Sequence, residues 1–220
     1  MNTSTATHSY HELLAEKTIQ FGFNPFGGLS EAEKSVALQP KYDLEAMAES
    51  LLDDPPQLIE FLGRKGRGKT THLVALHNML PDTPIFLLDQ ERLLSKINLA
   101  TSSILFIDSI QKVPILERQQ LWKNPRLSIV YTTHIPRYWA KMIAAKNFNS
   151  YSFKGINAKE LEKMIRARLQ LAATHNLPPY QFEPHFIQQL IRLHGDHIRG
   201  IMNQLYDEFY KLRMGNGDSF

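Results

Sequence analysis

The chain has no cysteine among its 220 residues, and this absence excludes two kinds of structure. A fold held together by disulfides is ruled out, and so is a metal site built from thiolates. Long apolar runs are missing as well, because none approaches the roughly 18 residues that a membrane-spanning helix needs. Met1 to Tyr10 is polar and does not resemble a signal peptide. We therefore expect a soluble, cytoplasmic protein.

Charge of one sign is also scarce. The 25 Lys and Arg residues and the 22 Asp and Glu residues leave a net charge of +3. An excess this small does not indicate a nucleic-acid partner, although it does not exclude one. The nine histidines include no pair at helical ligand spacing with a matching acid, so we expect no metal site built from histidines.

The chain does contain a glycine-rich basic segment, Gly63-Arg64-Lys65-Gly66-Arg67-Gly68-Lys69-Thr70, which fits G-x-x-x-x-G-K-[ST]. In such a phosphate-binding loop, backbone N–H groups surround the phosphates, the lysine reaches the β- and γ-phosphates, and the hydroxyl ligates Mg²⁺. A predicted strand enters the segment and an amphipathic helix leaves it, as the loop requires. We expect ATP as the ligand, bound by Gly63, Gly66, Arg67, Gly68, Lys69, Thr70 and Thr71.

Short apolar runs on both sides of this loop predict a sheet. The predicted strands are residues 58–62, 84–89, 104–108, 127–132 and 150–153. Three of the later runs are continuously apolar, which is typical of a parallel sheet covered by helices on both faces. Asp108 ends the third strand, 39 residues after Lys69, and a strand there delivers a carboxylate to the magnesium shell. We therefore predict Thr70 and Asp108 as the magnesium ligands.

From Ile156 onwards the pattern becomes helical. Asn157 and Glu160 have the spacing of a capped helix start, and apolar faces continue over 186–193 and 198–212. We predict an α/β protein: a three-layer P-loop core with a five-stranded, mainly parallel sheet, followed by a small all-helical subdomain. The expected boundaries are a flexible segment at 1–20, the core at 21–155, the helical subdomain at 156–214 and a tail at 215–220.

The loop, the acid strand, a polar strand and the helical end together resemble the AAA+ ATPases over residues 21–213. Asn24-Pro25-Phe26 adds a loose similarity to the AAA+ ATPases of transposition and secretion systems. The resemblance implies a sensor strand in which Thr132 or Thr133 orients the attacking water, and we choose Thr133. Gly195-Asp196-His197-Ile198-Arg199 resembles the sensor-2 motif of the family's helical lid, with the arginine one position later than in its commonest form. The resemblance implies that Arg199 touches the γ-phosphate.

The resemblance also implies partners. In this family an arginine finger reaches the neighbouring subunit's nucleotide, and Arg137 and Arg126 are the two candidates here. We expect an ATP-dependent homo-oligomer or a protein partner.

The chain departs from the family in two places. Ser109 stands where active members have a glutamate as general base, and a hydroxyl cannot accept a proton near neutral pH. Either hydrolysis is slow or another acid replaces it, and Asp89 and Glu91 are candidates because they follow a strand that ends at the same edge. We select Asp89, with Asp108 and Thr133, as catalytic. The second departure is the absence from 90–103 of the aromatic-apolar-glycine triplet of protein-threading members, which counts against an unfoldase.

These features favour a nucleotide-controlled switch or adaptor with slow ATP hydrolysis. Two alternatives stay open. One is a P-loop kinase for a small molecule, which would use Asp89 and Glu91. The other is a pseudo-ATPase that serves only as an interaction module.

Overall fold

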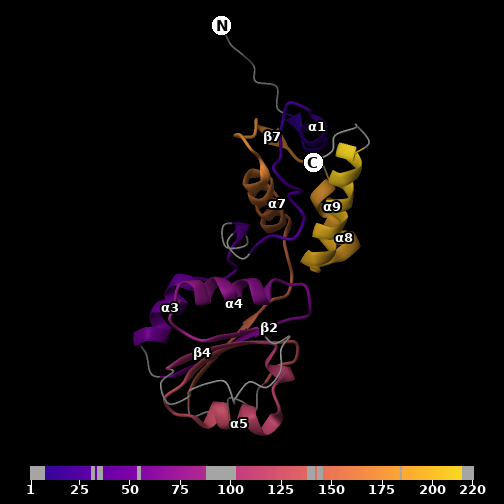
Figure 1. Ribbon diagram of the computed structural model, residues 1–220. Coiled ribbons are helices and arrows are strands. Elements are labelled where there is room, and N and C mark those ends of the chain that lie inside the picture. The colour runs from indigo at the N-terminus through magenta and orange to yellow at the C-terminus, as the bar shows by residue number, and fades with distance from the viewer. Residues whose placement is uncertain are drawn as a thin grey trace. The chain divides into compact units, whose positions relative to one another are not determined.

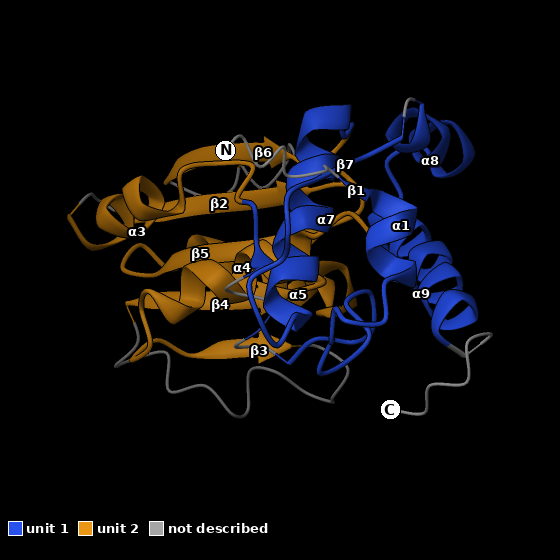
Figure 2. Ribbon diagram, turned by 90° about the horizontal axis from the view of Figure 1, so that it is seen from above, with its two compact units in different colours: residues 1–39, 155–220 blue, residues 40–154 orange. Residues whose placement is uncertain are grey.

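The computed structural model describes residues 8–30, 33, 37–53, 56–87, 103–137, 142, 146–183 and 185–214. The chain forms two compact units, coloured separately in Figure 2. Unit 1 consists of residues 1–39 and 155–220, and unit 2 consists of residues 40–154. The chain therefore passes between the units twice, once after Gln39 and once after Lys154.

Unit 2 contains a parallel sheet of five strands in the order β3-β4-β5-β2-β6. The strands are β2 (Gln57–Leu62), β3 (Ile85–Leu87), β4 (Ile104–Asp108), β5 (Ser128–Thr133) and β6 (Asn147–Ser152). All five predicted strands are present, so the predicted α/β fold is confirmed. β6 begins three residues earlier than predicted, because an edge strand is half exposed and its polar start, Asn147 to Asn149, lacks an apolar pattern.

Helices cover both faces of this sheet (Figure 1). α3 (Leu44–Asp53) and α4 (Lys69–Asn78) lie on one face, and α5 (Ile115–Lys123) lies on the other. A short 3₁₀ turn, η2 (Ile110–Lys112), precedes α5. The sequence analysis missed α5, because Ile115 and Leu116 are exposed while Leu121 and Trp122 supply its buried face, which blurs the helical pattern. The three-layer core is as predicted.

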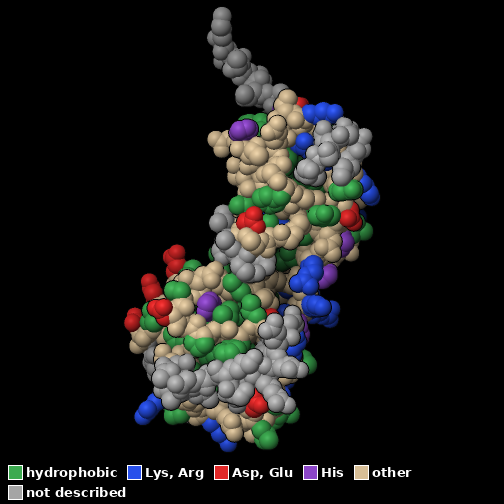
Figure 3. All heavy atoms as spheres, viewed as in Figure 1, with side chains coloured by type: hydrophobic (Ala, Val, Ile, Leu, Met, Phe, Trp, Pro, Cys, Tyr) green, Lys and Arg blue, Asp and Glu red, His purple; other side chains and the backbone are tan. Residues whose placement is uncertain are grey.

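The outer face of α3 is acidic. Its exposed side chains include Glu45, Glu49 and Asp53, and Figure 3 shows acidic side chains gathered where α3 lies. Such a face repels a phosphate backbone, so it does not suit nucleic acid. Within the described ranges, no helix has the length and apolar character to cross a membrane.

Unit 1 is mainly helical. Its helices are α1 (Tyr10–Ala15), α7 (Ala158–Ala172), α8 (Phe186–His194) and α9 (Ile198–Met214), and β1 (His8–Ser9) pairs in parallel with β7 (Tyr180–Gln181). The predicted helix start is present: Asn157 Oδ1 accepts the Glu160 N–H at 2.9 Å, and Glu160 Oε2 accepts the Asn157 N–H at 3.0 Å. The two-stranded pair is an addition to the all-helical subdomain that the sequence predicted.

The N-terminal boundary requires a correction. The sequence analysis placed a flexible segment at 1–20 and started the core at 21, whereas residues 8–30 pack within unit 1 and unit 2 starts at Pro40. Tyr10, Leu13 and Leu14 on α1 are fully buried. These three apolar side chains pack in the core of unit 1. They hold the segment in place although most of its other residues are polar.

Two arginines hold this segment to the helices of unit 1. The Arg168 guanidinium donates to the carbonyl oxygens of Pro25 at 3.1 Å and Gly27 at 3.3 Å, and Arg213 donates to Ile19 O at 2.8 Å. The predicted tail at 215–220 lies outside the described residues.

Candidate nucleotide-binding site

The glycine-rich segment forms the loop between β2 and α4, and three of its glycines occupy positions that other residues do not fit. Gly66 and Gly68 have φ angles of 83° and 84°, in the left-handed region that glycine tolerates best. At Gly63 a Cβ atom would lie 2.5 Å from Phe153 O, so the loop packs directly against the chain that follows β6. No side chain caps the N-terminus of α4 at Gly68, which leaves that helix end without a side-chain acceptor.

Lys69, the first residue of α4, folds back inside the loop. Its side-chain Nζ donates to Arg64 O at 2.8 Å, and the residue is only 5% exposed. Burial lowers the pKa of Lys69, the Asp108 carboxylate opposes this decrease and the Arg67 charge adds to it, which leaves the pKa at about 8. The structure thus brings Arg67 and Asp108 into electrostatic range of Lys69. Thr71 lies half-buried in the first turn of α4.

Thr70 and Asp108 meet at the C-terminal edge of the sheet. Thr70 Oγ1 donates to Asp108 Oδ1 at 3.0 Å, and Thr132 Oγ1 donates to the same oxygen at 2.6 Å. Hydroxyl and carboxylate oxygens are hard donors of the kind that Mg²⁺ prefers. The residues present therefore fit the predicted magnesium site. Among the residues that the structure describes, no cluster of three His, Cys, Asp or Glu side chains could hold another metal.

The two threonines of β5 that the sequence analysis considered face opposite sides, because successive residues of a strand alternate. Thr132 contacts Asp108, as described above. Thr133 is fully buried and its hydroxyl donates to Ile135 O at 2.9 Å. The sequence analysis chose Thr133, whereas Thr132 is the threonine that contacts the Asp108 carboxylate.

His134 is a site residue that the sequence analysis did not select. Its Nδ1 lies 3.0 Å from Gly63 O and 3.4 Å from Lys69 Nζ. A carbonyl oxygen only accepts, so Nδ1 carries a proton and donates to it. His134 Nδ1 and Lys69 Nζ are then both donors, so no hydrogen bond joins them. The only sequence signal for His134 was its place directly after the sensor strand.

Ser109 lies next to Asp108 in an unusual conformation. Its φ and ψ angles are 62° and 53°, in the left-handed region, and its N–H donates to Thr132 Oγ1 at 2.7 Å. Gln111 follows in η2, and its Oε1 is buried without a hydrogen-bond partner. The two alternative acids, Asp89 and Glu91, lie outside the described residues.

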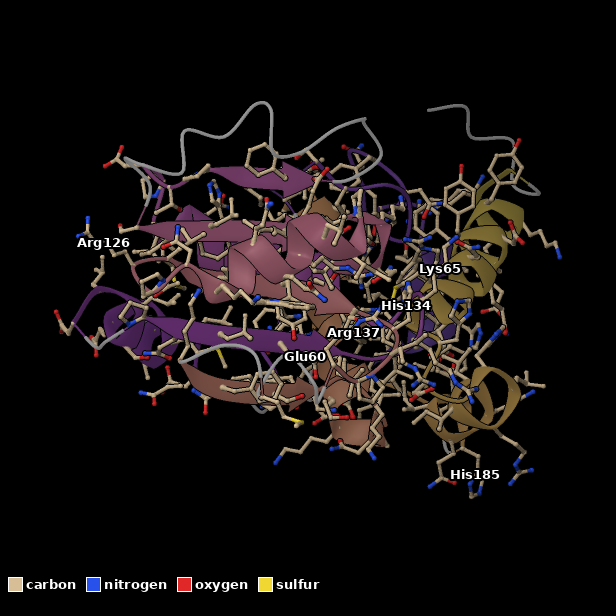
Figure 4. All side chains as sticks on the ribbon, turned by 90° about the horizontal axis from the view of Figure 1, so that it is seen from below. Glu60, Lys65, Arg126, His134, Arg137 and His185 are labelled. Atoms are coloured by element: carbon tan, nitrogen blue, oxygen red, sulfur yellow. The ribbon has the colours of Figure 1, made fainter. Side chains whose placement is uncertain are left out.

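The candidate arginines lie in different surroundings. Arg199 is exposed in the first turn of α9, in unit 1. Arg137 follows β5, its backbone N–H donates to Glu60 Oε2 at 3.0 Å, and its Nε is buried without a partner. Arg126 precedes β5 and lies at the opposite end of the sheet from Lys65 and His134 (Figure 4).

Glu60 is a buried carboxylate in the middle of β2 that the sequence analysis also missed. Besides the Arg137 N–H, it accepts hydrogen bonds from Tyr131 Oη at 3.0 Å and Ser150 Oγ at 2.7 Å. Burial raises the pKa of Tyr131, and the Glu60 charge adds to this effect. This carboxylate joins β2 to β5, to β6 and to the segment that carries His134.

The comparisons with known proteins give structural neighbours only. No protein-family model matches the chain, and no curated protein sequence matches it. A structure of Drosophila ORC bound to DNA contains a similar chain, with a TM-score of 0.53 and 11% identity over 98% of this chain and 64% of that one. A DNA replication initiation factor has a TM-score of 0.47 and 16% identity over 82% and 67% of the two chains. Saccharomyces cerevisiae RIF2 has a TM-score of 0.44 and 9% identity over 82% and 86%.

The likeness to ORC concerns the fold alone, because the identity is so low. It supports the α/β fold described above, with its parallel five-stranded sheet and a mainly helical unit. The chain spans less than two thirds of the length of the ORC chain.

Proposed function

We propose that this chain binds ATP together with Mg²⁺ and works as a nucleotide-controlled switch or adaptor that hydrolyses ATP slowly. The observation that carries the proposal is the convergence of Lys69, Thr70 and Asp108 at one edge of the sheet, beside a loop with two left-handed glycines. A cation, a hydroxyl and a carboxylate in this order are the groups that a phosphate-magnesium pair requires.

The charges around the loop also suit an anion. Lys69 Nζ and His134 Nδ1 are two donors 3.4 Å apart, and an anionic oxygen could accept hydrogen bonds from both in place of Arg64 O and Gly63 O. A phosphate oxygen would replace Arg64 O as the partner of the ammonium. It would favour the charged form and raise the pKa of Lys69 from its value of about 8.

Thr70 and Asp108 would hold the magnesium ion, which, when bound, neutralises charge on the phosphate oxygens. Thr132 fixes the orientation of the Asp108 carboxylate, since its hydroxyl donates to Oδ1 and accepts the Ser109 N–H. The three residues form one chain of hydrogen bonds that links β4 to β5.

Slow hydrolysis follows from Ser109. A positioned general base typically contributes about 10²–10⁴-fold to a rate, and a serine hydroxyl does not supply it. Gln111 can orient a water molecule through its amide, but it cannot take a proton from it. ATP should therefore stay bound for long enough to act as a signal.

The signal would be read through unit 1 and through a partner. Arg199 on α9 would contact the γ-phosphate and bias the position of the helical unit. Arg137 or Arg126 would act on a neighbouring subunit. The similar ORC chain comes from a complex with DNA, whereas the weak net charge and acidic α3 of this chain favour a homo-oligomer or a protein partner.

Titration of ATP with and without Mg²⁺ tests the proposal, using Asp108→Asn as the variant. The variant should bind ATP without Mg²⁺ as well as the original chain does, and should lose the gain that Mg²⁺ provides. Phosphate release with ATP alone, compared with release that requires an added metabolite, separates an ATPase from the kinase alternative. Binding without any release would support the pseudo-ATPase.

A further inference from the structure

The two segments that connect the units are fastened to each other within unit 2. Lys41 Nζ donates to Lys154 O at 2.8 Å, and Tyr42 Oη donates to Ser152 O at 2.6 Å. The first segment leads into unit 2 just after Gln39, and the second leaves it at Lys154. We call residues 40–42 and 152–155 the connecting segments.

The second connecting segment contacts the phosphate loop, and the first contacts His72 in α4, the helix that follows the loop. Phe153 N donates to Leu62 O at 2.6 Å, and Phe153 O lies 2.5 Å from the position that a Cβ of Gly63 would take. Lys41 N donates to Nε2 of His72, at 3.0 Å. Gly155, the first residue of unit 1 after the second segment, has a φ of 74°, and its N–H donates to Asp196 Oδ2 within the same unit at 2.8 Å. The loop is thus joined to both paths between the units.

His72 links the first connecting segment to the loop. Its Nδ1 lies 2.9 Å from Gly68 O, the carbonyl directly before Lys69. A backbone N–H can only donate and a carbonyl can only accept, so Nε2 accepts from Lys41 and Nδ1–H donates to Gly68. The imidazole ring also stands edge-on to Phe153, with centroids 4.7 Å apart. One buried, neutral ring therefore touches the loop and both connecting segments.

We infer that His72 is a positioning residue that couples the phosphate loop to the connecting segments. Nucleotide binding at the loop then stabilises the connecting segments that lead to unit 1. The inference rests on the proposed function for its ligand. A phosphate that draws Lys69 away from Arg64 O moves the peptide of Gly68, and the Nδ1–H bond passes this movement to the ring. A ring that is hydrogen-bonded on both sides and packed against Phe153 passes it on to Lys41.

Amide hydrogen exchange tests the coupling first without nucleotide. His72→Phe keeps an aromatic ring against Phe153 and removes both hydrogen bonds. It should speed exchange at the Lys41 amide and at residues 70–73 in α4 by about tenfold, the effect of losing one hydrogen bond. His72→Gln retains a donor and an acceptor and should restore part of the protection. His77→Phe is the matched control, because His77 lies on the same helix, bonds Thr83 O at 2.8 Å and stands edge-on to Phe106. It should change neither region.

The second arm adds Mg²⁺ and a non-hydrolysable ATP analogue. In the original chain, exchange should slow both at 63–71 and at the connecting segments, whereas in His72→Phe it should slow at 63–71 only. An equal response of the connecting segments in both chains would overturn the inference, and so would a His72→Phe variant whose exchange at 70–73 is unchanged without nucleotide. Failure of the original chain to respond at 63–71 would refute nucleotide binding instead, and the first arm would still decide the coupling.

Discussion

Replacing Ser109 by glutamate should accelerate ATP hydrolysis, and the structure limits by how much. Ser109 adjoins Asp108 at the end of β4, where the proposed function lacks a general base, and it is half exposed. Its left-handed backbone, with φ 62°, already carries the strain of about 1–2 kcal/mol that an L-residue has there, so glutamate adds little to it. The left-handed backbone also points the new carboxylate in a different direction from a side chain at the end of an extended strand. We therefore expect a gain of about tenfold, or about 1.4 kcal/mol, and not the full 10²–10⁴ of a positioned base.

Repulsion between the new carboxylate and Asp108 works in the opposite direction, because it raises the pKa of one of the two acids. Bound magnesium relieves part of this repulsion. Steady-state phosphate release from the original chain, Ser109→Glu and Ser109→Gln measures the gain, and the glutamine variant controls for side-chain size. If the glutamine variant is as fast as the glutamate variant, the carboxylate is not the cause. If the original chain is already fast and Asp89→Ala abolishes its activity, the base is on the other strand.

Three further results are expected. Thr132→Val should weaken Mg²⁺-dependent ATP binding by about tenfold, because Asp108 loses a hydrogen bond to a charged group, whereas Thr133→Val should leave it within about twofold; equal losses in a binding titration would refute this distinction. Burial lowers the pKa of Lys146, as of Lys69, to about 8 in the fold, so above pH 8 each of these lysines binds more protons in the unfolded chain and makes the free energy of unfolding rise with pH, until tyrosines with a raised pKa, such as Tyr131, oppose the rise near pH 10. Lys146→Met should reduce that slope in denaturant unfolding, and an unchanged slope would contradict the assignment. A non-hydrolysable ATP analogue should promote self-association in light scattering, and Arg137→Ala should reduce it. A protein that stays monomeric with the analogue at tens of micromolar would have an association free energy weaker than about −6 to −7 kcal/mol, which would count against a homo-oligomer.

The sequence predicted the sheet well because its central strands are buried on both faces. β4 and the centre of β5 are apolar runs whose ends carry the candidate site residues, so a pattern of hydrophobicity also located Asp108. The loop was predicted for a similar reason, because only glycine fits its left-handed positions. Both features are local, and both can be recognised from neighbouring residues.

The parts that were missed depend on contacts between distant residues. His72 reads as one polar residue in an amphipathic helix, and its role appears only when Lys41 and Phe153 lie beside it. Glu60 looks like an interruption of an apolar strand until Tyr131 and Ser150 are seen to satisfy it. The choice between the two threonines depended on which face of β5 carries the Asp108 contact, and the strand pattern alone did not fix that face.

The phosphate-loop assignment is tested most directly by the affinity for ATP with Mg²⁺, measured by isothermal titration. Lys69→Ala removes the buried ammonium at the centre of the loop, and Lys65→Ala removes an exposed charge of the same loop as the control. Lys69→Ala should lose about 2–3 kcal/mol of binding free energy, as expected for a desolvated charge-assisted hydrogen bond, with an unchanged circular dichroism spectrum. Lys65→Ala should lose less than about 1 kcal/mol. Equal ATP affinity of Lys69→Ala and the original chain would contradict the account.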